Sequence, residues 1–199
     1  MLRKLEEKLS GLKIAGLLRR KRIAQSPTQT RQSINNHDNS ISTEKTLFCS
    51  NDYLGLASHP EVIAALKDGI DKWGGGSGAS HLISGHMAPH EELENMISQL
   101  FSGLISDNRC ITFSTGYMAN LAVITALAQG DCEIFSDELN HASLIDGIRL
   151  CKKTVKIFKH ANYDHLAMML NESTAELRLI VTDGVFSMDG DKADLDTLY

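Results

Sequence analysis

The chain has 199 residues, of which 42% are hydrophobic and 23% are charged, and its formal net charge is −5. This length suits one domain of ordinary size, and this composition excludes a disordered protein. The acidic balance argues against a general nucleic-acid binder, and no apolar run is long enough to span a bilayer. We therefore expect neither nucleic acid nor a membrane as a partner.

The first residues and the cysteines indicate the compartment. Residues 1–22 carry acidic side chains early and contain no apolar signal core, so they do not form a secretory signal. The four cysteines are scattered without a Cys-x-x-Cys pair, which argues against a zinc site or a disulfide framework. We expect a reducing, cytoplasmic location and no bound metal.

The N-terminal region, residues 1–45, is predicted to be a helix followed by a polar linker. Leucines recur at near-helical spacing over residues 1–22, which predicts an amphipathic helix that ends in the basic cluster 19–22. These cations could serve only as a solvated helix end, where the helix dipole favours them. Residues 25–44 are rich in Ser, Thr, Asn and Gln, a composition that is typical of a loop.

Residues 46–199 are predicted to form a second domain, in which strands and helices alternate regularly from residue 110. This alternation predicts an α/β fold with a mostly parallel sheet and helices on both faces. The pattern is unfinished at Tyr199, so we expect the chain to be a piece of a longer protein. The predicted strands are 46–49, 110–114, 132–136, 155–159 and 177–186, and the predicted helices are 60–73, 88–101, 116–129, 141–151 and 164–173, with another helix beginning after the turn 187–195.

Three predicted strand ends carry residues that suit a ligand. Gly116 and Tyr117 open a helix directly after a strand, where unpaired backbone N–H groups attract an anion, although an ordinary turn has the same pattern. His141 opens the next helix as a ligand, a stacking partner or a cap. Asp183 and Ser187 follow the carboxyl end of a strand, where open α/β sheets bind ligands, although Asp-rich turns also occur without function. The pattern alone predicts an α/β domain with an anion-binding edge.

Two common catalytic patterns are absent from the sequence. There is no Gly-x-Ser-x-Gly elbow, and no Gly-x-Gly-x-x-Gly opens a helix after a strand. Hydrolase and Rossmann dehydrogenase interpretations therefore lose their main support. An unrelated nucleotide-binding α/β domain stays open as an alternative.

The chain contains five segments that share one resemblance: SNDYLGLASHP, GSGASHLISGH, STGYMAN, LNHASLIDG and TDGVFSMDGD. In this order and spacing they resemble the α-oxoamine synthases, which are fold-type I enzymes that use pyridoxal 5'-phosphate. The resemblance implies the large cofactor-binding domain of these enzymes, pyridoxal phosphate as the cofactor, and a homodimer with its sites at the subunit interface.

The reaction implied by this resemblance is a decarboxylating condensation of an amino acid with an acyl thioester. The segment ASHLISGHMAPHEELE is most similar to the members that condense L-alanine with pimeloyl-CoA or pimeloyl-carrier protein in biotin biosynthesis. The segment LNHASLIDGIRLCK is also similar to the members that acylate glycine with acetyl-CoA, so that activity is the alternative.

The resemblance also assigns roles to individual residues. Gly116 and Tyr117 are expected to donate backbone N–H groups to the cofactor phosphate. His141 is expected to be a catalytic residue that stacks on the cofactor ring and contacts the substrate. Four further residues complete the expected site: Ser187 and Asp183 beside the cofactor, Arg19 on the acyl substrate, and Asn51 near the amino acid.

One expected group is outside the sequence. The resemblance implies that the lysine which holds the cofactor, and the aspartate that pairs with its ring nitrogen, lie beyond Tyr199. Lys13 and Lys45 each stand three residues after a serine, but both lie in the N-terminal region 1–45 and not after the predicted sheet, where the resemblance implies the cofactor lysine. We therefore expect this chain by itself to bind pyridoxal phosphate weakly and to lack turnover, and a non-catalytic remnant of the family is a further alternative.

Overall fold

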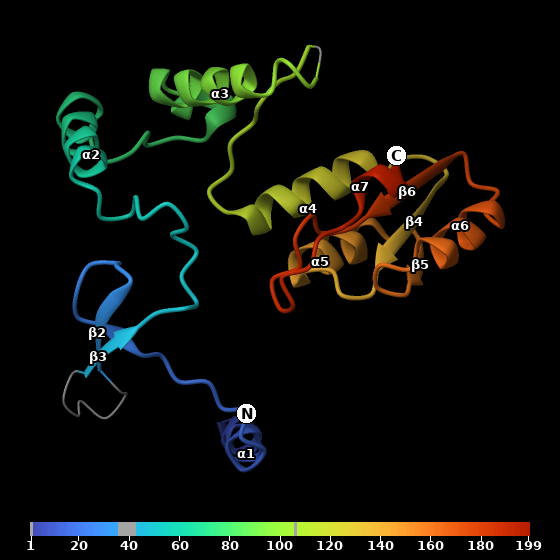
Figure 1. Cartoon of the computed structure of the whole chain (residues 1–199), viewed down its shortest axis with the longest axis horizontal. Helices are drawn as coiled ribbons and strands as arrows, with labels where there is room; N and C mark the ends of the chain where they lie inside the picture. Colours follow the sequence, from blue (N-terminus) through green and yellow to red (C-terminus); the bar gives the residue numbers. More distant parts are fainter. Residues whose placement is uncertain (1, 36–42, 106) are drawn as a thin grey trace. The chain divides into compact units, whose positions relative to one another are not determined.

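The chain divides into two compact units, Met1–Gly85 and His86–Tyr199. Their elements are drawn in Figure 1, a computed structural model that describes residues 2–35, 43–105 and 107–199. Contacts therefore divide the chain at residue 85, and the predicted domain boundary at residue 45 stays a prediction. Within the described residues, every helix is too short or too polar to cross a membrane.

The first helix, α1 (Leu2–Ile14), ends earlier than the predicted residue 22. Gly16 stops it, because its φ of 69° is a left-handed conformation that favours glycine. The Leu17 N–H donates to the Leu12 carbonyl and the Gly16 N–H donates to the Lys13 carbonyl, which is the Schellman pattern of a helix end. The basic residues 19–22 are consequently not part of a helix.

A small antiparallel sheet takes up part of the predicted polar loop 25–44. The loop prediction was wrong for the residues of this sheet, and residues 36–42 lie outside the described part of the chain. Its strands are polar and pair through their backbones, so they lack the alternation of apolar residues that identifies a strand in a sequence. The predicted strand 46–49 also lies a few residues too late. The sheet has the order β1-β2-β3, with β1 (Ile23–Ala24), β2 (Arg31–Asn35) and β3 (Thr43–Thr46).

The rest of the first unit contains α2 (Pro60–Trp73), which has the predicted bounds, and a π-helical turn at His81–Gly85. The turn closes through a hydrogen bond of 2.8 Å from the Gly85 N–H to the Ser80 carbonyl. A Cβ on Gly85 would lie 2.0 Å from the Ala79 carbonyl oxygen, so only glycine fits there. The segment GSGASHLISGH thus contains a tightly folded turn that ends at Gly85.

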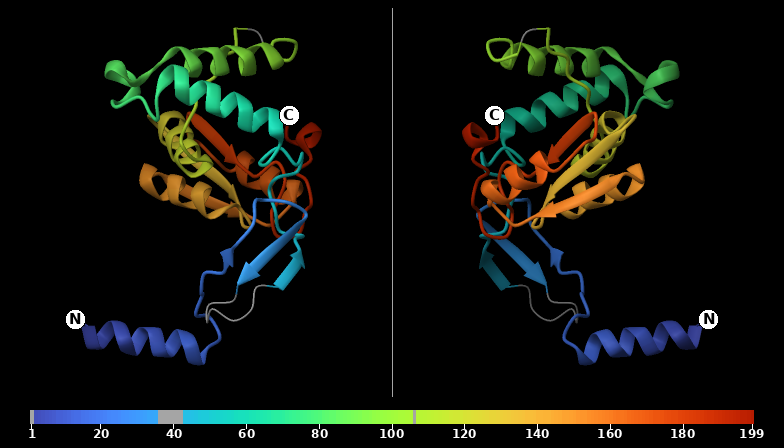
Figure 2. Two further views of the ribbon diagram at one scale, coloured as in Figure 1. Left: turned by 90° about the vertical axis from the view of Figure 1, so that its left-hand side faces the viewer. Right: turned by 90° about the vertical axis from the view of Figure 1, so that its right-hand side faces the viewer.

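The second unit contains a parallel sheet whose strands run in one direction (Figure 2). The three strands have the order β5-β4-β6, and the connecting helices follow the predicted ones within a few residues. This confirms the predicted α/β fold. The strands are β4 (Cys132–Asp137), β5 (Thr154–Phe158) and β6 (Leu177–Val181), and the helices are α3 (Ala88–Leu100), α4 (Gly116–Leu127), α5 (Ala142–Cys151), α6 (Tyr163–Asn171) and α7 (Leu195–Leu198).

Helices cover both faces of this sheet, as Figure 1 shows for α5 and α6 on either side of β4. The side chains of β4 alternate between the faces, because successive residues of a strand point in opposite directions. Ile134 packs with Ile124 of α4 and Ile148 of α5, whereas Phe135 packs with Phe158 of β5 and Leu166 of α6. Burying each such side chain contributes about 1.5–3 kcal/mol. One apolar layer on each face of the sheet therefore holds β4, and with it the loop that follows the strand, in position.

Two predicted strands need correction. Residues 110–114 form no strand, because the segment has no ladder partner among the described residues. The backbone N–H of Thr112 donates instead to the carboxylate of Glu94 at 2.8 Å. The predicted strand 177–186 ends at Val181, where the chain leaves the sheet.

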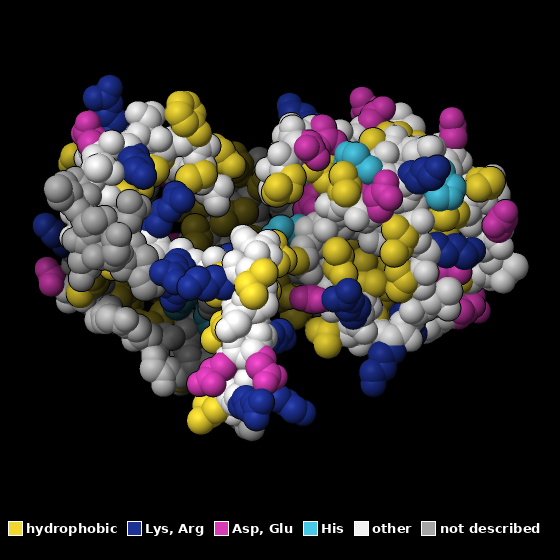
Figure 3. All heavy atoms as spheres, turned by 90° about the horizontal axis from the view of Figure 1, so that it is seen from below, with side chains coloured by type: hydrophobic (Ala, Val, Ile, Leu, Met, Phe, Trp, Pro, Cys, Tyr) yellow, Lys and Arg dark blue, Asp and Glu magenta, His cyan; other side chains and the backbone are white. Residues whose placement is uncertain are grey.

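Hydrophobic side chains remain exposed on the surface of both units (Figure 3). Leu82 is 92% exposed in the first unit and Met188 is 93% exposed in the second. Apolar surface of this extent is typical of regions that pack against other protein.

Candidate functional site

A hollow of about 410 Å³ lies at the carboxyl end of the second unit's sheet. It is where open α/β sheets bind ligands, because the loops after parallel strands meet at this edge. The hollow brings together three residues predicted from the sequence: His141, Asp183 and Ser187. It is lined by Leu139, Asn140, His141, Ala142, Asp183, Phe186, Ser187, Met188 and Asp189.

His141 is the N-cap of α5, one residue before the helix begins. Its side chain accepts a hydrogen bond of 3.2 Å from the Ser143 N–H through Nδ1. Its own backbone N–H donates to the Asp183 carboxylate at 2.7 Å. The sequence left a cap and a ligand as alternatives, and this geometry shows that His141 is a cap whose ring also lines the hollow.

The ring of His141 is oriented by two side chains. Asn120 donates to the Ser143 hydroxyl at 2.8 Å, and that hydroxyl lies 2.7 Å from His141 Nδ1. Since the Asn120 amide occupies the hydroxyl as a donor, the hydroxyl proton is directed to Nδ1, which also accepts from the Ser143 backbone. In the neutral ring the proton is therefore on Nε2, so the tautomer follows from the partners of Nδ1.

Asn140 links the ends of β4 and β6, the two strands whose following loops line the hollow. This residue is 5% exposed, and its amide nitrogen donates to the Val181 carbonyl at 2.7 Å and to the Ser136 hydroxyl at 3.0 Å. Its carbonyl oxygen accepts from the Asp183 N–H at 3.1 Å. Each polar group of this buried amide thus has a partner, as buried polar groups require.

Gly116 and Tyr117 begin α4, next to the start of α5. Thr115 caps the helix by accepting from the Met118 N–H, and no hydrogen bond within the described residues uses the N–H groups of Gly116 or Tyr117. Such free first-turn N–H groups attract anions. Neither residue lines the hollow, and the Asn120–Ser143 hydrogen bond is what connects their helix to His141.

The side chain of Tyr117 is held by Asp146 of α5. The phenol donates to the Asp146 carboxylate, which raises the pKa of Tyr117 and lowers the pKa of Asp146. The two helices approach closely behind this pair, because a Cβ on Gly147 would meet Ile124 Cδ1 at 3.1 Å. The close approach keeps the two helix starts side by side.

Arg19 and Asn51 belong to the first unit, and both are exposed. A hollow of about 570 Å³ in that unit is lined by Ser50 and Asp52, the neighbours of Asn51, but not by Asn51 itself. The substrate roles of Arg19 and Asn51 remain predictions.

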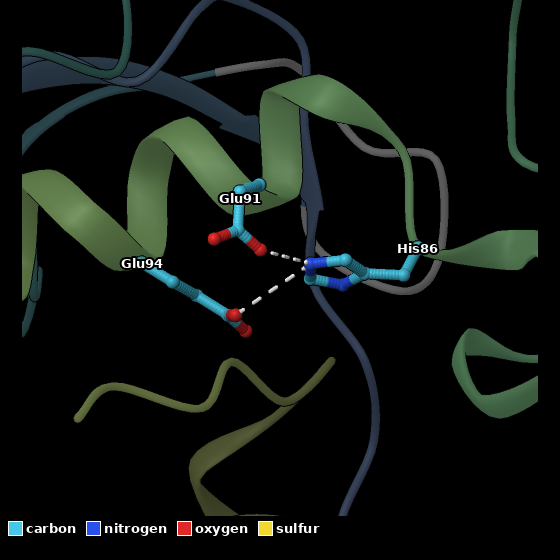
Figure 4. Close-up of side chains that lie close together, drawn as sticks. All are labelled: His86, Glu91 and Glu94. Carbon is cyan, nitrogen blue, oxygen red and sulfur yellow. Dashed lines mark hydrogen bonds and ion pairs between the residues drawn. The ribbon is translucent and has the colours of Figure 1, made fainter.

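A separate cluster near the start of α3 could hold a metal ion. His86 Nε2 lies 2.9 Å from Glu91 and 3.8 Å from Glu94, and Figure 4 shows both carboxylates on the side of the ring that carries this nitrogen. The candidate ligand atoms lie within 4.8 Å of one another. His86 also lowers the pKa of Glu91, and Glu94 accepts from Thr112, so these groups already serve as each other's partners. The expectation of no metal stays a prediction.

Sequence reasoning missed the residues that orient the site, which are Asn120, Ser143 and Asn140. Each is a small polar residue beside a predicted site residue or one helix turn away from it. Asn140 carried a weak signal, because an amide only three residues after a fully buried strand is close enough to the core to need internal partners. The partners of Asn120 and Ser143 lie on different helices, so no local pattern indicates them.

Comparison with known proteins identifies the family to which this fold belongs. A family model described as aminotransferase class I and II matches residues 43–199. The chain belongs to the aminotransferase class I and II family. The matched region contains the whole parallel sheet and the hollow at its carboxyl end.

Several relatives in this family are named 8-amino-7-oxononanoate synthase. The proteins of that name from Janthinobacterium sp. (strain Marseille) and Bordetella petrii are 47% and 50% identical to the chain, over 98% of its length. The chain spans about half of these relatives, 48% of each.

Solved structures of the family have the same fold. Serine palmitoyltransferase of Sphingomonas wittichii superposes on 98% of the chain with a TM-score of 0.83 and 29% identity, and the match covers 47% of that chain. The enzyme of S. paucimobilis, with bound PLP and myriocin, gives a TM-score of 0.82, 29% identity and the same coverage. An 8-amino-7-oxononanoate synthase from Francisella tularensis matches 76% of the chain and 40% of its own length, with 33% identity and a TM-score of 0.58.

Proposed function

We propose that this chain is part of a pyridoxal-phosphate-dependent acyltransferase that condenses L-alanine with a pimeloyl thioester to give 8-amino-7-oxononanoate. The observation that carries the proposal is the convergence of His141, Asp183 and Ser187 on one hollow at the carboxyl edge of the sheet. Relatives about half identical to the chain bear the name of this synthase, which supports the choice of substrates.

The groups in the hollow and at the start of α4 fit pyridoxal phosphate in kind. The free N–H groups of Gly116 and Tyr117 at a helix start suit a phosphate, and the positive end of the helix dipole adds to the attraction. The flat ring of His141 suits stacking on a heteroaromatic ring, and the Ser187 hydroxyl suits a polar atom of the cofactor. When bound, the cofactor supplies an electron sink for negative charge at the substrate α-carbon.

The chain's own residues hold and orient the reacting groups. His141 keeps one ring orientation because Nδ1 is occupied by Ser143, which leaves Nε2–H as its donor. Asp183 supports His141 through the backbone and adds a negative charge beside the hollow. A carboxylate there favours a protonated, positively charged nitrogen on whatever occupies the hollow.

The substrates are assigned by charge and by the earlier resemblance. Arg19 is proposed to bind the acyl substrate, since a guanidinium forms a pair of hydrogen bonds with a carboxylate such as the free end of a pimeloyl group. Asn51 is proposed to contact L-alanine. A homodimer in the cytoplasm completes the proposal, and the exposed apolar surface of both units favours association with further protein.

Equilibrium dialysis of pyridoxal phosphate against the chain tests the cofactor site. We expect weak, saturable binding that His141→Ala and Ser187→Ala each reduce, with Asp164→Asn as the control, because Asp164 is exposed on α6 and does not line the hollow. Equal binding by all four proteins would contradict the site.

An activity assay tests the substrates. Because the chain spans about half of its relatives, it is mixed with the other half of the Bordetella petrii relative as a separate polypeptide. We expect L-alanine and pimeloyl-CoA to give the amino ketone, and glycine and acetyl-CoA to give little product. The opposite preference would favour the glycine-acylating alternative.

A further inference from the structure

His160 lies between two carboxylates in the second unit, and it is not one of the residues of the candidate site. Its Nδ1 is 3.0 Å from an oxygen of Asp137, and its Nε2 is 2.7 Å from an oxygen of Asp191. Asp137 ends β4, whereas Asp191 lies in the turn after Phe186. One imidazole thus joins two segments that are far apart in the sequence.

The two carboxylates have different surroundings. The side chain of Asp137 is 2% exposed and also accepts the N–H groups of Leu139 at 2.9 Å and Ala161 at 3.2 Å. Asp191 accepts from His160 through Oδ2, and its buried Oδ1 has no partner among the described residues. Asp137 is therefore held in position by its backbone donors, and His160 is the group that holds the Asp191 side chain.

The turn that carries Asp191 also carries Ser187. It closes through the Phe186 N–H on the Asp191 carbonyl at 2.9 Å and the Gly190 N–H on the Phe186 carbonyl at 2.8 Å. The ring of Phe186 is 4% exposed and meets the edge of the His160 ring, with 4.4 Å between the ring centres. His160 consequently contacts both ends of the turn, on either side of Ser187.

We propose that His160 is a positioning residue that, as an imidazolium, holds the turn 186–191 against the end of β4 and so keeps Ser187 at the hollow. His160 does not line the hollow, so its effect on a ligand passes through the turn. The effect on the cofactor rests on the proposed function, whereas the effect on the turn does not.

The number of N–H groups on the ring explains why the charge matters. An imidazolium has two N–H donors, one for each carboxylate, and a neutral imidazole has only one. Loss of the proton therefore removes one of the two hydrogen bonds. The Asp137 carboxylate keeps its two backbone donors, whereas the Asp191 carboxylate has no other donor among the described residues, so the contact with Asp191 is the one whose loss frees the turn.

The charged groups around His160 favour the imidazolium. The hydrogen bond to Asp137 raises the pKa of His160 above the ordinary 6.5. Burial lowers this pKa and the hydrogen bond to Asp191 raises it, so that the net effect is a rise. Glu138 accepts the His160 backbone N–H at 2.8 Å, and Lys159 and His165 are the basic groups nearby, joined to each other through the Lys159 N–H. We call the pair of hydrogen bonds from His160 to Asp137 and Asp191 the clamp. Because the pKa of His160 is raised in the folded chain, the clamp is complete below about pH 6.5 and is lost as the pH rises through the raised pKa.

Hydrogen exchange at the amides of Phe186 and Gly190 tests the proposal on the chain as it is. We compare the wild type with His160→Gln and Asp191→Asn, and we use Asp164→Asn as the control because it removes the same charge from an exposed position on α6. At acidic pH we expect both clamp variants to exchange at these amides about tenfold faster than the wild type, after correction for intrinsic rates. The control should match the wild type.

A pH series on the wild type needs no substitution and covers the case in which a variant fails to fold. Protection at Phe186 and Gly190 should fall as the His160 imidazole signal titrates in NMR, and the Asp191→Asn protein should titrate at lower pH. Protection that does not change while His160 titrates, or that is equal in variant and wild type, would overturn the proposal.

Binding of pyridoxal phosphate, measured by dialysis, separates this proposal from the proposed function. We expect its dissociation constant to rise several-fold in both clamp variants and in the wild type at alkaline pH. If the turn loosens as expected while no protein binds the cofactor, then the proposed function fails and the clamp stands. If the cofactor binds normally to a protein with a loosened turn, the link from His160 to Ser187 is refuted.

Discussion

The backbone N–H of His141 donates to the carboxylate of Asp183 at 2.7 Å, although the two residues are 42 positions apart in the sequence. This hydrogen bond ties the loop after β4 to the segment after β6. Those two segments form the wall of the hollow, so the position of the His141 ring depends on Asp183 as well as on its own helix.

Asp183→Ala should weaken binding of pyridoxal phosphate by about tenfold, because the His141 N–H loses a charged acceptor. Asp183→Asn is the matched control, since its side-chain oxygen can still accept that N–H, and a smaller loss is expected. Equilibrium dialysis measures both. An equal loss in the two variants would show that charge, rather than the hydrogen bond, is what matters.

Asn140→Ala should lower the free energy of unfolding by about 2–4 kcal/mol, because it leaves the Val181 carbonyl and the Asp183 N–H without their partner. Urea denaturation followed by circular dichroism gives the value. Asn171→Ala, at the exposed end of α6, is the control and should change stability by about 0.5 kcal/mol or less. A similar small change for Asn140→Ala would mean that water replaces these hydrogen bonds.

Tyr117 should ionise at a higher pH than an ordinary tyrosine, because its phenol donates a hydrogen bond to Asp146 and its pKa is raised. Its hydrogen bond to Asp146 raises its pKa above the ordinary 10.0, so the stability that this bond contributes is present below pH 10 and is lost as the pH rises through the raised pKa. Asp146 has the opposite dependence: its pKa is lowered, and its contribution is lost as the pH falls through that value. Tyrosinate absorbance measures the first effect.

Asp146→Asn should move the ionisation of Tyr117 to lower pH, and Tyr117→Phe should remove it from the titration curve. If the curve of Asp146→Asn coincides with that of the wild type, the Tyr117–Asp146 hydrogen bond does not form in solution.

Gly16→Ala should shorten or destabilise α1 by about 1 kcal/mol, because alanine is strained at a φ of 69°. Gly11→Ala is the matched comparison, since Gly11 lies inside the same helix with open space around it, and alanine there should raise helicity. Far-ultraviolet circular dichroism of the two variants should change in opposite directions. Changes in the same direction would contradict the observed helix end.

Much of the second unit could be predicted from the sequence because its helices and strands have local signals. The apolar run of β4 and the periodic apolar positions of α5 and α6 gave bounds within a few residues of those observed. Local signals failed where pairing decides the conformation. The segment 110–114 looks like a strand but has no neighbour among the described strands, whereas polar β2 and β3 are strands because they pair with each other.

The sequence by itself determined the α/β class, the family, and the two strand ends after which His141, Asp183 and Ser187 stand. These follow from residue order and from hydrophobic periods of a few residues, which act locally. Only the tertiary structure decided that Asn120 and Ser143 set the tautomer of His141, that Asn140 joins β4 to β6, and that His160 lies between Asp137 and Asp191. Hydrogen bonds between side chains depend on distance and direction in space, and residues 23 to 41 positions apart acquire both only when the helices and strands pack.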